Sequence, residues 1–421
     1  MSFSPEPRRP TGAVLPSPWR AWPDVTASLS SRWHQLREGL PPSFLALLLG
    51  TFINRLGSFI APLLFVYLTQ ARGLGLVTAG RVAALSGLGS FVGIMGGGAL
   101  ADRLGRRATM LWSLVLGANC MLLLGAASQP YELAGAAFLL GLTGDAFRPA
   151  SQALIADVVP PEHRVKAFSI QYWAINLGFT FAAIIGGYMA TRSFTALFVG
   201  DAATTLVLAV IVLRWVPESR PAPRPDERPQ GSVLTPFVDP RYAVFLVLNF
   251  AMALVFFQHV TGLPEDMRQK GLTTGAYGWA IACNGVLIVL LQPASIGWSR
   301  RLSQASLLGL AALLTGVGFG LTTFASTLPA YMATVAVWSL GEILFSPVNA
   351  SIVAELSPVD MRGRYQGAYT MTWSLAGFLS PATLPWVMER VGMPTFWGLC
   401  AALGLATAVA HLTVGRRLLG H

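Results

Sequence analysis

The chain has 421 residues, of which 53% are hydrophobic and only 11% are charged. This composition is too apolar for an ordinary soluble protein and is typical of an integral membrane protein. Basic loops at a membrane surface account for the formal net charge of +10, so we expect no nucleic-acid partner.

Residues 1–42 are predicted to form a cytoplasmic tail before the membrane region. They contain no apolar stretch typical of a cleavable signal peptide. Within them, AWPDVTASLSSRWHQLREGL places apolar residues at helical spacing with Arg32 and Arg37 between them. This pattern fits a helix lying on the inner leaflet, and a disordered tail is the alternative.

Twelve apolar runs of about 20 residues follow, each long enough to cross a bilayer as a helix. They cover approximately residues 43–68, 76–100, 109–128, 132–156, 167–190, 195–215, 242–262, 274–296, 304–325, 328–354, 365–386 and 395–415. We therefore predict an all-α integral membrane protein with twelve transmembrane helices.

Positive charge is distributed unevenly between the two ends of these helices. Of the 29 Lys and Arg residues, 21 lie on the side that holds both chain ends, six lie on the other side, and two lie inside spans. Because cytoplasmic loops retain Lys and Arg, both termini are predicted to be cytoplasmic.

An internal repeat divides the spans into two sets of six. FRPASQALIADVVPPEHR, starting at Phe147, aligns with FSPVNASIVAELSPVDMR, starting at Phe345, in the fourth span of each set. Residues 216–241, rich in Pro and Arg, form the predicted cytoplasmic linker between bundles 43–215 and 242–415, and residues 416–421 form a short cytoplasmic tail. Two parallel repeats of this kind are typical of transporters.

Glycines in the second span predict a closely packed neighbour. GSFVGIMGG spaces Gly89, Gly93 and Gly97 four residues apart, which leaves one helix face without side chains. Another helix can approach such a face closely.

The loop between the second and third spans, GGALADRLGRR (residues 97–107), combines glycines with charges. Gly98 and Gly105 allow a tight turn, and Asp102 can sit at the N-terminus of a neighbouring helix. Arg106 or Arg107 can reach an acid at a span end, for which Asp157 is a candidate. Together with Arg103, these residues are predicted to form a cytoplasmic gate, with solvated loop charges as the alternative.

This loop resembles the signature of the major facilitator superfamily, and RGRYQG (residues 362–367) is similar to the basic loop before the eleventh span of its drug-exporting members. The resemblance covers residues 43–416 and is closest to twelve-span bacterial multidrug exporters. It implies two pseudo-symmetric six-helix bundles around a central cavity, working by alternating access in the inner membrane. Two departures concern antiport: the fifth span lacks the proline of the antiporter motif, and the fourth has no Arg near its start.

Four charged residues are predicted near mid-depth, where a charge persists only if it is paired or faces a wet cavity: Arg55, Asp145, Arg148 and Glu342. The resemblance implies that spans one, four, seven and ten line the cavity, and these four residues lie in spans one, four and ten.

Asp145 and Arg148 share one helix face, and the pair is either part of the site or a closed structural ion pair. Pro149 leaves the carbonyl of Asp145 without its usual donor. Glu342 has no basic residue within one turn, and an isolated carboxylate at that depth costs less with a proton bound, so Glu342 and Asp145 are the proton-coupling candidates. Arg55 either pairs with Glu342 or meets an anionic substrate. Further cavity candidates are Asn176, Asn249, Gln258, Trp338 and Phe345.

The five histidines are scattered over chain ends and loops, and the three cysteines show no paired spacing, so we expect no metal, no cofactor and no enzymatic activity. A phosphate-binding loop of the Walker type is absent from the sequence. The predicted function is proton-coupled efflux of small amphipathic or drug-like molecules by a monomer. The alternatives are a proton symporter or facilitator for a small anionic metabolite and a non-transporting membrane receptor.

Overall fold

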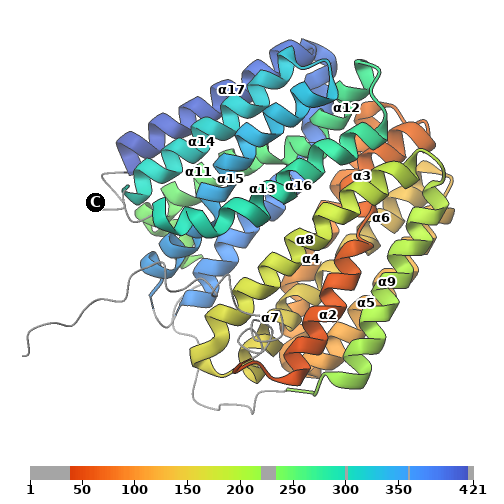
Figure 1. Ribbon diagram of the computed structural model, residues 1–421, viewed down its shortest axis with the longest axis vertical. Coiled ribbons are helices and arrows are strands. Elements are labelled where there is room, and N and C mark those ends of the chain that lie inside the picture. The colour runs from red at the N-terminus through yellow and green to blue at the C-terminus, as the bar shows by residue number, and fades with distance from the viewer. Residues whose placement is uncertain (1–37, 220–233, 299–301, 359–360, 416–421) are drawn as a thin grey trace, which may run out of the picture. The chain divides into compact units, whose positions relative to one another are not determined.

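The computed structural model describes residues 38–219, 234–298, 302–358 and 361–415 (Figure 1). By their contacts, residues 41–421 form one unit and residues 1–40 another. The predicted surface helix before residue 38, most of the predicted linker and the predicted tail after residue 415 lie outside the described residues.

Every regular element of the described residues is helical. The N-terminal half contains α2 (Pro42–Leu56), α3 (Ile60–Val66), η2 (Tyr67–Ala71), α4 (Leu76–Leu104), α5 (Arg106–Ala126), α6 (Pro130–Asp145), α7 (Phe147–Val158), η3 (Pro161–His163), α8 (Arg164–Ala190) and α9 (Phe194–Trp215). The C-terminal half contains α10 (Thr235–Val238), α11 (Pro240–Phe256), η4 (Phe257–His259), α12 (Gly262–Gln269), α13 (Thr274–Trp298), α14 (Gln304–Leu321), η5 (Thr322–Phe324), α15 (Leu328–Leu356), α16 (Arg362–Val391), α17 (Met393–Ala410) and η6 (His411–Gly415).

Ten helical runs among the described residues are long and apolar enough to cross a membrane. The other two predicted spans are the fourth and the eleventh. The fourth is divided at Ala146 into α6 and α7, each too short by itself. The eleventh, α16, carries Ser, Thr and Pro residues that lower its mean hydropathy.

Three predicted spans are interrupted, and each interruption lies four residues before a proline. In the first span, α2 ends at Leu56 and α3 begins at Ile60, because Pro62 has no N–H to donate to the carbonyl of Ser58. In the fourth, Pro149 deprives Asp145 of its donor in the same way, as expected from the sequence.

The seventh span repeats the pattern of the first in the second half. Its helix breaks between α11 and α12, four residues before Pro264. The predicted end of this span at residue 262 is wrong, because α12 continues to Gln269 despite its charges. Glu265 and Asp266 are buried there because Arg268 and Lys270 neutralise them at 2.6 and 3.0 Å.

Within the first half, the glycine face of α4 packs against α6 as the spacing predicted. A Cβ on Gly89 would lie 2.0 Å from the carbonyl oxygen of Phe138, and one on Gly93 would lie 2.3 Å from that of Leu142. The backbones of the two helices are therefore too close for any side chain at these positions.

The two halves meet through two helix pairs, α4 with α16 and α8 with α13. Small residues allow both contacts: a Cβ on Gly87 would lie 2.8 Å from the carbonyl oxygen of Gly377, and one on Gly278 would lie 2.4 Å from that of Ala183. In Figure 1, α8 and α13 lie side by side near α12 and separate toward the lower left.

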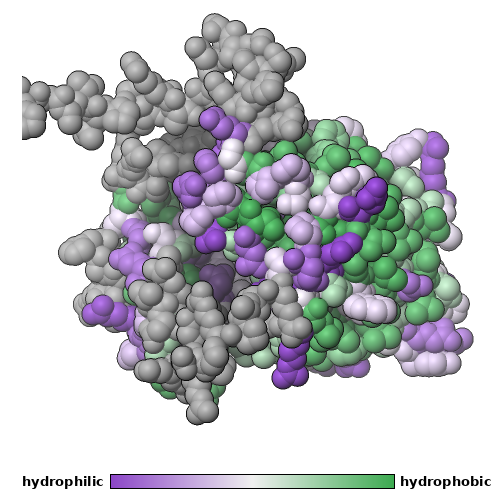
Figure 2. All heavy atoms as spheres, turned by 90° about the horizontal axis from the view of Figure 1, so that it is seen from below, coloured by the Kyte–Doolittle hydropathy of each residue, from purple (hydrophilic) through white to green (hydrophobic). Residues whose placement is uncertain are grey.

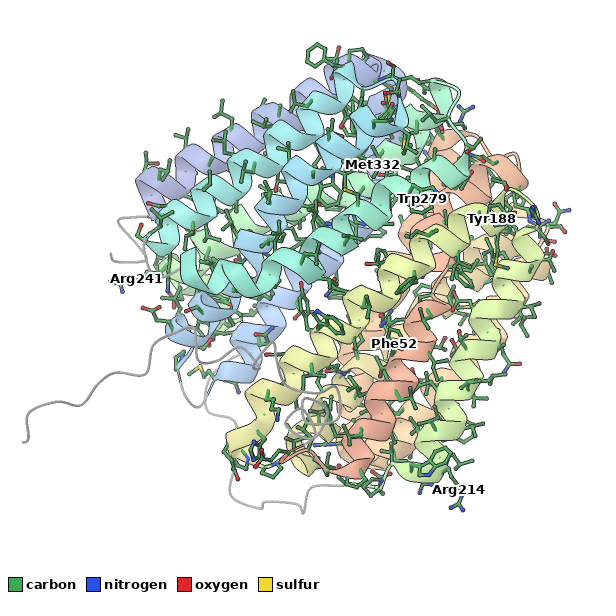
Figure 3. The ribbon with its side chains drawn as sticks, viewed as in Figure 1. Phe52, Tyr188, Arg214, Arg241, Trp279 and Met332 are labelled. Carbon is green, nitrogen blue, oxygen red and sulfur yellow. The ribbon has the colours of Figure 1, made fainter. Side chains whose placement is uncertain are left out.

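Figure 3 shows Arg214, at the end of α9, and Arg241, at the start of α11, pointing away from the helices. We call the end of the helices that holds these two residues and Arg103 the basic end, and the end that holds α12 the opposite end. Seen from below, the molecule shows hydrophilic side chains near the middle of the face, with hydrophobic side chains between and beside them (Figure 2). These hydrophilic side chains fit a position outside the hydrocarbon layer.

Two side chains make polar contacts between the halves at the opposite end. The hydroxyl of Thr274 lies 3.0 Å from the side-chain oxygen of Gln70. The hydroxyl of Tyr277 donates to the carbonyl of His259 at 2.9 Å and faces that of Pro62 at 3.4 Å, so this one buried side chain touches both interrupted first spans of the two halves. The conformation is therefore held together at the opposite end.

Candidate functional site

Glu342 lies in the middle of α15, and its hydrogen-bond partner is an amide. The side-chain nitrogen of Asn284, on α13, donates to Glu342 Oε2 at 2.7 Å and to the hydroxyl of Ser339 at 3.0 Å. No ion pair to Glu342 occurs within the described part of the chain. The structure thus places the expected unpaired carboxylate beside a neutral donor, and Arg55 is not its partner.

Tyr172 brings the other half of the molecule to this carboxylate. It lies on α8, and its side chain lies near Glu342 and near Ser346, one turn further along α15. The side chain of Asn176, a predicted cavity residue, donates to the carbonyl of Tyr172 at 2.9 Å and is partly exposed. The site around Glu342 is therefore shared between α8, α13 and α15.

Asp145 and Arg148 form an ion pair at the break between α6 and α7. Arg148 Nε lies 2.7 Å from Asp145 Oδ1, and the Arg148 side chain is 59% exposed. The two charges neutralise each other on one helix face, yet the guanidinium remains accessible. The structure thus shows the ion pair of one alternative with an exposed Arg148, and the other alternative, that the pair is part of the site, stays a prediction.

Arg55 lies at the C-terminal end of α2, directly before the break in the first span. Three charged side chains act on its guanidinium: Arg148 repels it, and Asp145 and Asp201, the latter on α9, attract it. Its Nε is buried and has no hydrogen-bond partner among the described residues. The backbone at Arg55 is packed tightly, since a Cβ on Gly178 of α8 would lie 2.6 Å from the Cβ of Arg55.

Asp201 is a buried acid that the sequence reasoning missed, only 3% exposed. Its Oδ2 accepts a hydrogen bond from the backbone N–H of Ile60 at 3.1 Å, so it caps the N-terminus of α3 inside the protein. Beside it, the side chain of Asn54 donates to the hydroxyl of Thr205 at 2.9 Å. An acid inside the apolar run FVGDAATT was the signal, by the same cost argument that singled out Glu342.

Four predicted cavity residues are packed inside the C-terminal half instead: Asn249, Gln258, Trp338 and Phe345. The expectation that they line a cavity is wrong for this conformation, because each has found partners within its own half.

The two amides are held by hydroxyl groups of α16. Asn249 donates to Thr372, and Gln258 donates to Ser380 at 2.8 Å. The aromatic pair packs against other rings. Trp338 stacks on Phe319 with 5.4 Å between ring centroids, and Phe345 meets Trp373 edge to face.

At the basic end, the loop after α4 is organised by two acids. Arg106 donates to the carbonyl of Ala101 at 2.8 Å, and its Nε lies 3.5 Å from Asp157 Oδ2. The same carboxylate oxygen accepts from the hydroxyl of Ser219 at 2.9 Å. Asp157 therefore links the loop to the chain that follows α9, in the region where the sequence predicted a gate.

Glu218 is the second acid, and the sequence reasoning did not name it. Its carboxylate accepts from the backbone N–H groups of Arg107 and Ala108 at 3.1 Å each and so caps α5. That is the position for which Asp102 was a candidate, and the side chain of Asp102 lies outside the described part of the structure. The guanidinium of Arg107 donates to the carbonyl of Leu213.

The two glycines of the loop differ in role. Gly105 has a φ of +106°, and a Cβ there would lie 2.5 Å from the carboxyl carbon of Glu218, so both the turn and the close approach require glycine. The prediction that Gly98 forms a tight turn is wrong, because α4 continues through it to Leu104. Arg103 is exposed in the last turn of α4. Among the described residues, no three His, Cys, Asp or Glu side chains are placed to hold a metal ion.

The family model for the Major Facilitator Superfamily matches residues 47–273 and 249–418. The chain is 26% identical over 378 residues to multidrug resistance protein MdtH of Cronobacter sakazakii, covering 86% of this chain and 91% of that protein. It is 24% identical over 368 residues to the Na(+), Li(+), K(+)/H(+) antiporter of Planococcus maritimus, covering 79% and 86%.

Solved structures share the fold at low sequence identity. A POT family transporter in complex with a thioalcohol-conjugated peptide superposes with a TM-score of 0.79 at 15% identity, covering 91% of this chain and all of that one. A D-xylose-proton symporter superposes with a TM-score of 0.70 at 16% identity, covering 88% and 96%. The helical architecture, the shared fold and the match along almost the whole chain agree. The chain belongs to the major facilitator superfamily and is a multi-pass membrane transporter.

Proposed function

We propose that this transporter is driven by protons and exports small amphipathic, drug-like molecules by alternating access. The observation that carries the proposal is Glu342, a carboxylate in the middle of a membrane-spanning helix whose hydrogen-bond partner is the amide of Asn284. A charge in that position is costly unless something neutralises it. A proton or a cationic cargo can do so, one at a time.

The balance of charge inside the spans supports this role. Five charged residues lie at least seven residues from either end of a described span: two cations, Arg55 and Arg148, and three acids, Asp145, Asp201 and Glu342. Asp145 forms an ion pair with Arg148, and the negative charge of Asp201 attracts the positive charge of Arg55. With all five ionised the set carries one excess negative charge, so one bound proton makes it neutral.

The orientation of the chain in the membrane sets the direction of transport in this mechanism. We take the basic end as cytoplasmic, because Lys and Arg are retained on that side. We propose that the contacts at the opposite end close that side and that this conformation opens toward the cytoplasm. Cargo entering from the cytoplasm displaces the proton from Glu342, the halves rock to the outward-open state, and a proton from outside replaces the cargo.

The relatives give the proposal its direction. One is a multidrug resistance protein, and another exchanges alkali cations for protons. One proton moving inward down about 100 mV and one pH unit releases about 3.7 kcal/mol, which would sustain a roughly 500-fold gradient of a neutral cargo. Exchange of one proton for a cargo with one positive charge moves no net charge, so the pH difference of about one unit alone drives it and sustains a roughly tenfold gradient. The proposed location is the inner membrane of a bacterial-type cell, with both termini in the cytoplasm and a monomer as the working unit.

A second candidate function rests on Arg55, whose Nε is buried without a partner among the described residues. Such a group can hold the carboxylate or phosphate of a small metabolite, which would make the protein a symporter or facilitator for an anion. The exposed guanidinium of Arg148 could assist, although it is already paired with Asp145.

Efflux from pump-deficient bacteria expressing the full chain tests the proposal. Cells receive wild type, Glu342→Gln or the control Glu389→Gln, an exposed acid near the end of α16, at equal membrane levels. We expect lower accumulation of at least one dye or antibiotic with wild type and with Glu389→Gln. A protonophore and Glu342→Gln should each abolish the effect.

If wild type still exports in the presence of the protonophore, or if Glu342→Gln exports as well as wild type in its absence, proton coupling through Glu342 is wrong. If no compound responds, and uptake of an anionic metabolite into proteoliposomes instead depends on Arg55, the second function replaces the first.

A further inference from the structure

Asn284 is fixed by hydrogen bonds on both of its amide hydrogens. One points to Glu342 at 2.7 Å and the other to Ser339 at 3.0 Å, while the hydroxyl of Ser339 donates to the carbonyl of Val335 at 2.7 Å. The side chain is 7% exposed. An amide N–H binds an ionised carboxylate more strongly than a neutral carboxyl group. Proton binding at Glu342 therefore weakens the link from α15 to Asn284 on α13.

Gly285, the residue after Asn284, lies where α13 contacts α8 of the other half. A Cβ on Gly285 would lie 2.0 Å from the hydroxyl oxygen of Thr180, on α8 of the other half. That hydroxyl donates to the carbonyl of Asn176 at 2.8 Å, so Thr180 is fixed to its own helix. With no space between the helices, a shift of α13 at Asn284 must change its contact with α8.

A second connection joins α8 to α15, because Tyr172 on α8 lies near α15. Its side chain lies near Glu342 and Ser346. Glu342, Asn284, Gly285, Thr180 and Tyr172 thus connect three helices from both halves.

The other titratable groups on the helices packed around α15 are few. α13 carries Tyr277, which bonds to backbone carbonyls, and Cys283, which faces Met332. α14 contains no ionisable side chain. On α16, Tyr369 interacts with Tyr172.

We propose that Asn284 is a positioning residue that transmits the protonation state of Glu342 to the contact between α8 and α13. The inference rests on the proposed proton coupling through Glu342 and adds the route by which proton binding reaches the interface. Asn284 does not hold the proton. It holds α13 in the place that suits an ionised Glu342, and releases it when the acid becomes neutral.

A double-mutant cycle with the full-length chain in lipid nanodiscs tests this route without any cargo. Glu342→Gln imitates the neutral acid, and Asn284→Leu removes the amide at similar volume. Hydrogen exchange of residues 178–188 and 274–288 is measured for wild type, both single variants and the double variant at one pH, where Glu342 of the wild type is ionised. We expect Glu342→Gln to speed exchange there by about tenfold, because a hydrogen bond to a charge has become a neutral one.

In the Asn284→Leu background, Glu342→Gln should then change exchange by less than about twofold. The control is Asn249→Leu, which removes a buried amide of the same half that bonds to Thr372 and has no link to Glu342. In that background the effect of Glu342→Gln should remain about tenfold. The pH midpoint of dye efflux should move up by about one unit in Asn284→Leu and stay in place in Asn249→Leu.

The outcomes separate the two proposals. If Glu342→Gln leaves exchange unchanged in the wild-type chain, the route from Glu342 to the contact between α8 and α13 is wrong, and the efflux assay with the protonophore decides separately whether Glu342 couples protons. If the effect of Glu342→Gln persists in full in the Asn284→Leu background, only the role of Asn284 is wrong.

If Asn284→Leu is not monodisperse after purification, the same contact is tested from the other side. Gly285→Ala should remove the response to Glu342→Gln, and the additional change Thr180→Gly, which vacates the space that the new methyl group needs, should restore it. Failure of Thr180→Gly to restore the response would overturn the route.

Discussion

The cap that Asp201 provides for α3 makes a quantitative prediction about stability. The first span is interrupted inside the protein, and the N–H of Ile60 bonds to Asp201 Oδ2 at 3.1 Å with the acid 3% exposed. Asp201→Ala leaves that N–H without an acceptor, which costs about 1–3 kcal/mol for a buried group. Asp201→Asn removes the charge but keeps an oxygen that can accept the bond.

We therefore expect Asp201→Ala to lose at least about 1 kcal/mol more stability than Asp201→Asn, or roughly 2–4 °C in melting temperature. Thr205→Val is the matched control, because it removes a polar contact between α9 and α2, the other part of the first span, and should cost only about 0.6 kcal/mol. Thermal unfolding of the purified protein in detergent, scanned at one fixed rate, gives the ranking. Equal losses for the alanine and asparagine variants would refute the capping argument and assign the stabilisation to the charge of Asp201 near Arg55.

Two further predictions concern glycines and the acid beside one of them. Gly105→Ala should destabilise the protein by more than about 1 kcal/mol, because φ is +106° there and the new Cβ would lie 2.5 Å from the carboxyl carbon of Glu218. Glu218→Ala should lower the stability by about 0.5–2 kcal/mol, and Glu218→Gln should lower it less. The melting temperature of each variant measures these losses. Gly278→Ala should separate α8 from α13 at the opposite end, because its Cβ would lie 2.4 Å from the carbonyl oxygen of Ala183. Hydrogen exchange of residues 178–188 should then become faster without global unfolding, and unchanged exchange would contradict this prediction.

The helices themselves could be predicted from the sequence, because a helix that crosses a membrane must satisfy its backbone internally and cover about 20 apolar residues. The glycine face of α4 and the missing donor at Asp145 followed from the same local rules. The breaks in the first and seventh spans were equally available, since Pro62 and Pro264 occupy matching places in the two halves. They were missed because apolar residues continue across them.

The candidate site was predicted less completely. Glu342, Asp145 and Arg148 stood out because charge inside an apolar run is costly wherever the helix packs. Asn249, Gln258, Trp338 and Phe345 were assigned to the cavity from their spans, but the face of a helix that a polar or aromatic side chain occupies depends on its neighbours.

By itself the sequence indicated that this protein lies in a membrane, that its spans are helical and where they lie along the chain, and at which places a buried charge needs an explanation. These properties depend on composition, periodicity and the cost of charge in hydrocarbon, which are local. Only the tertiary structure decided that Asn284 faces Glu342, that Asp201 caps α3 and that Glu218 caps α5. Each of these contacts joins residues at least 58 positions apart, and hydrogen bonds require a geometry that no local pattern encodes.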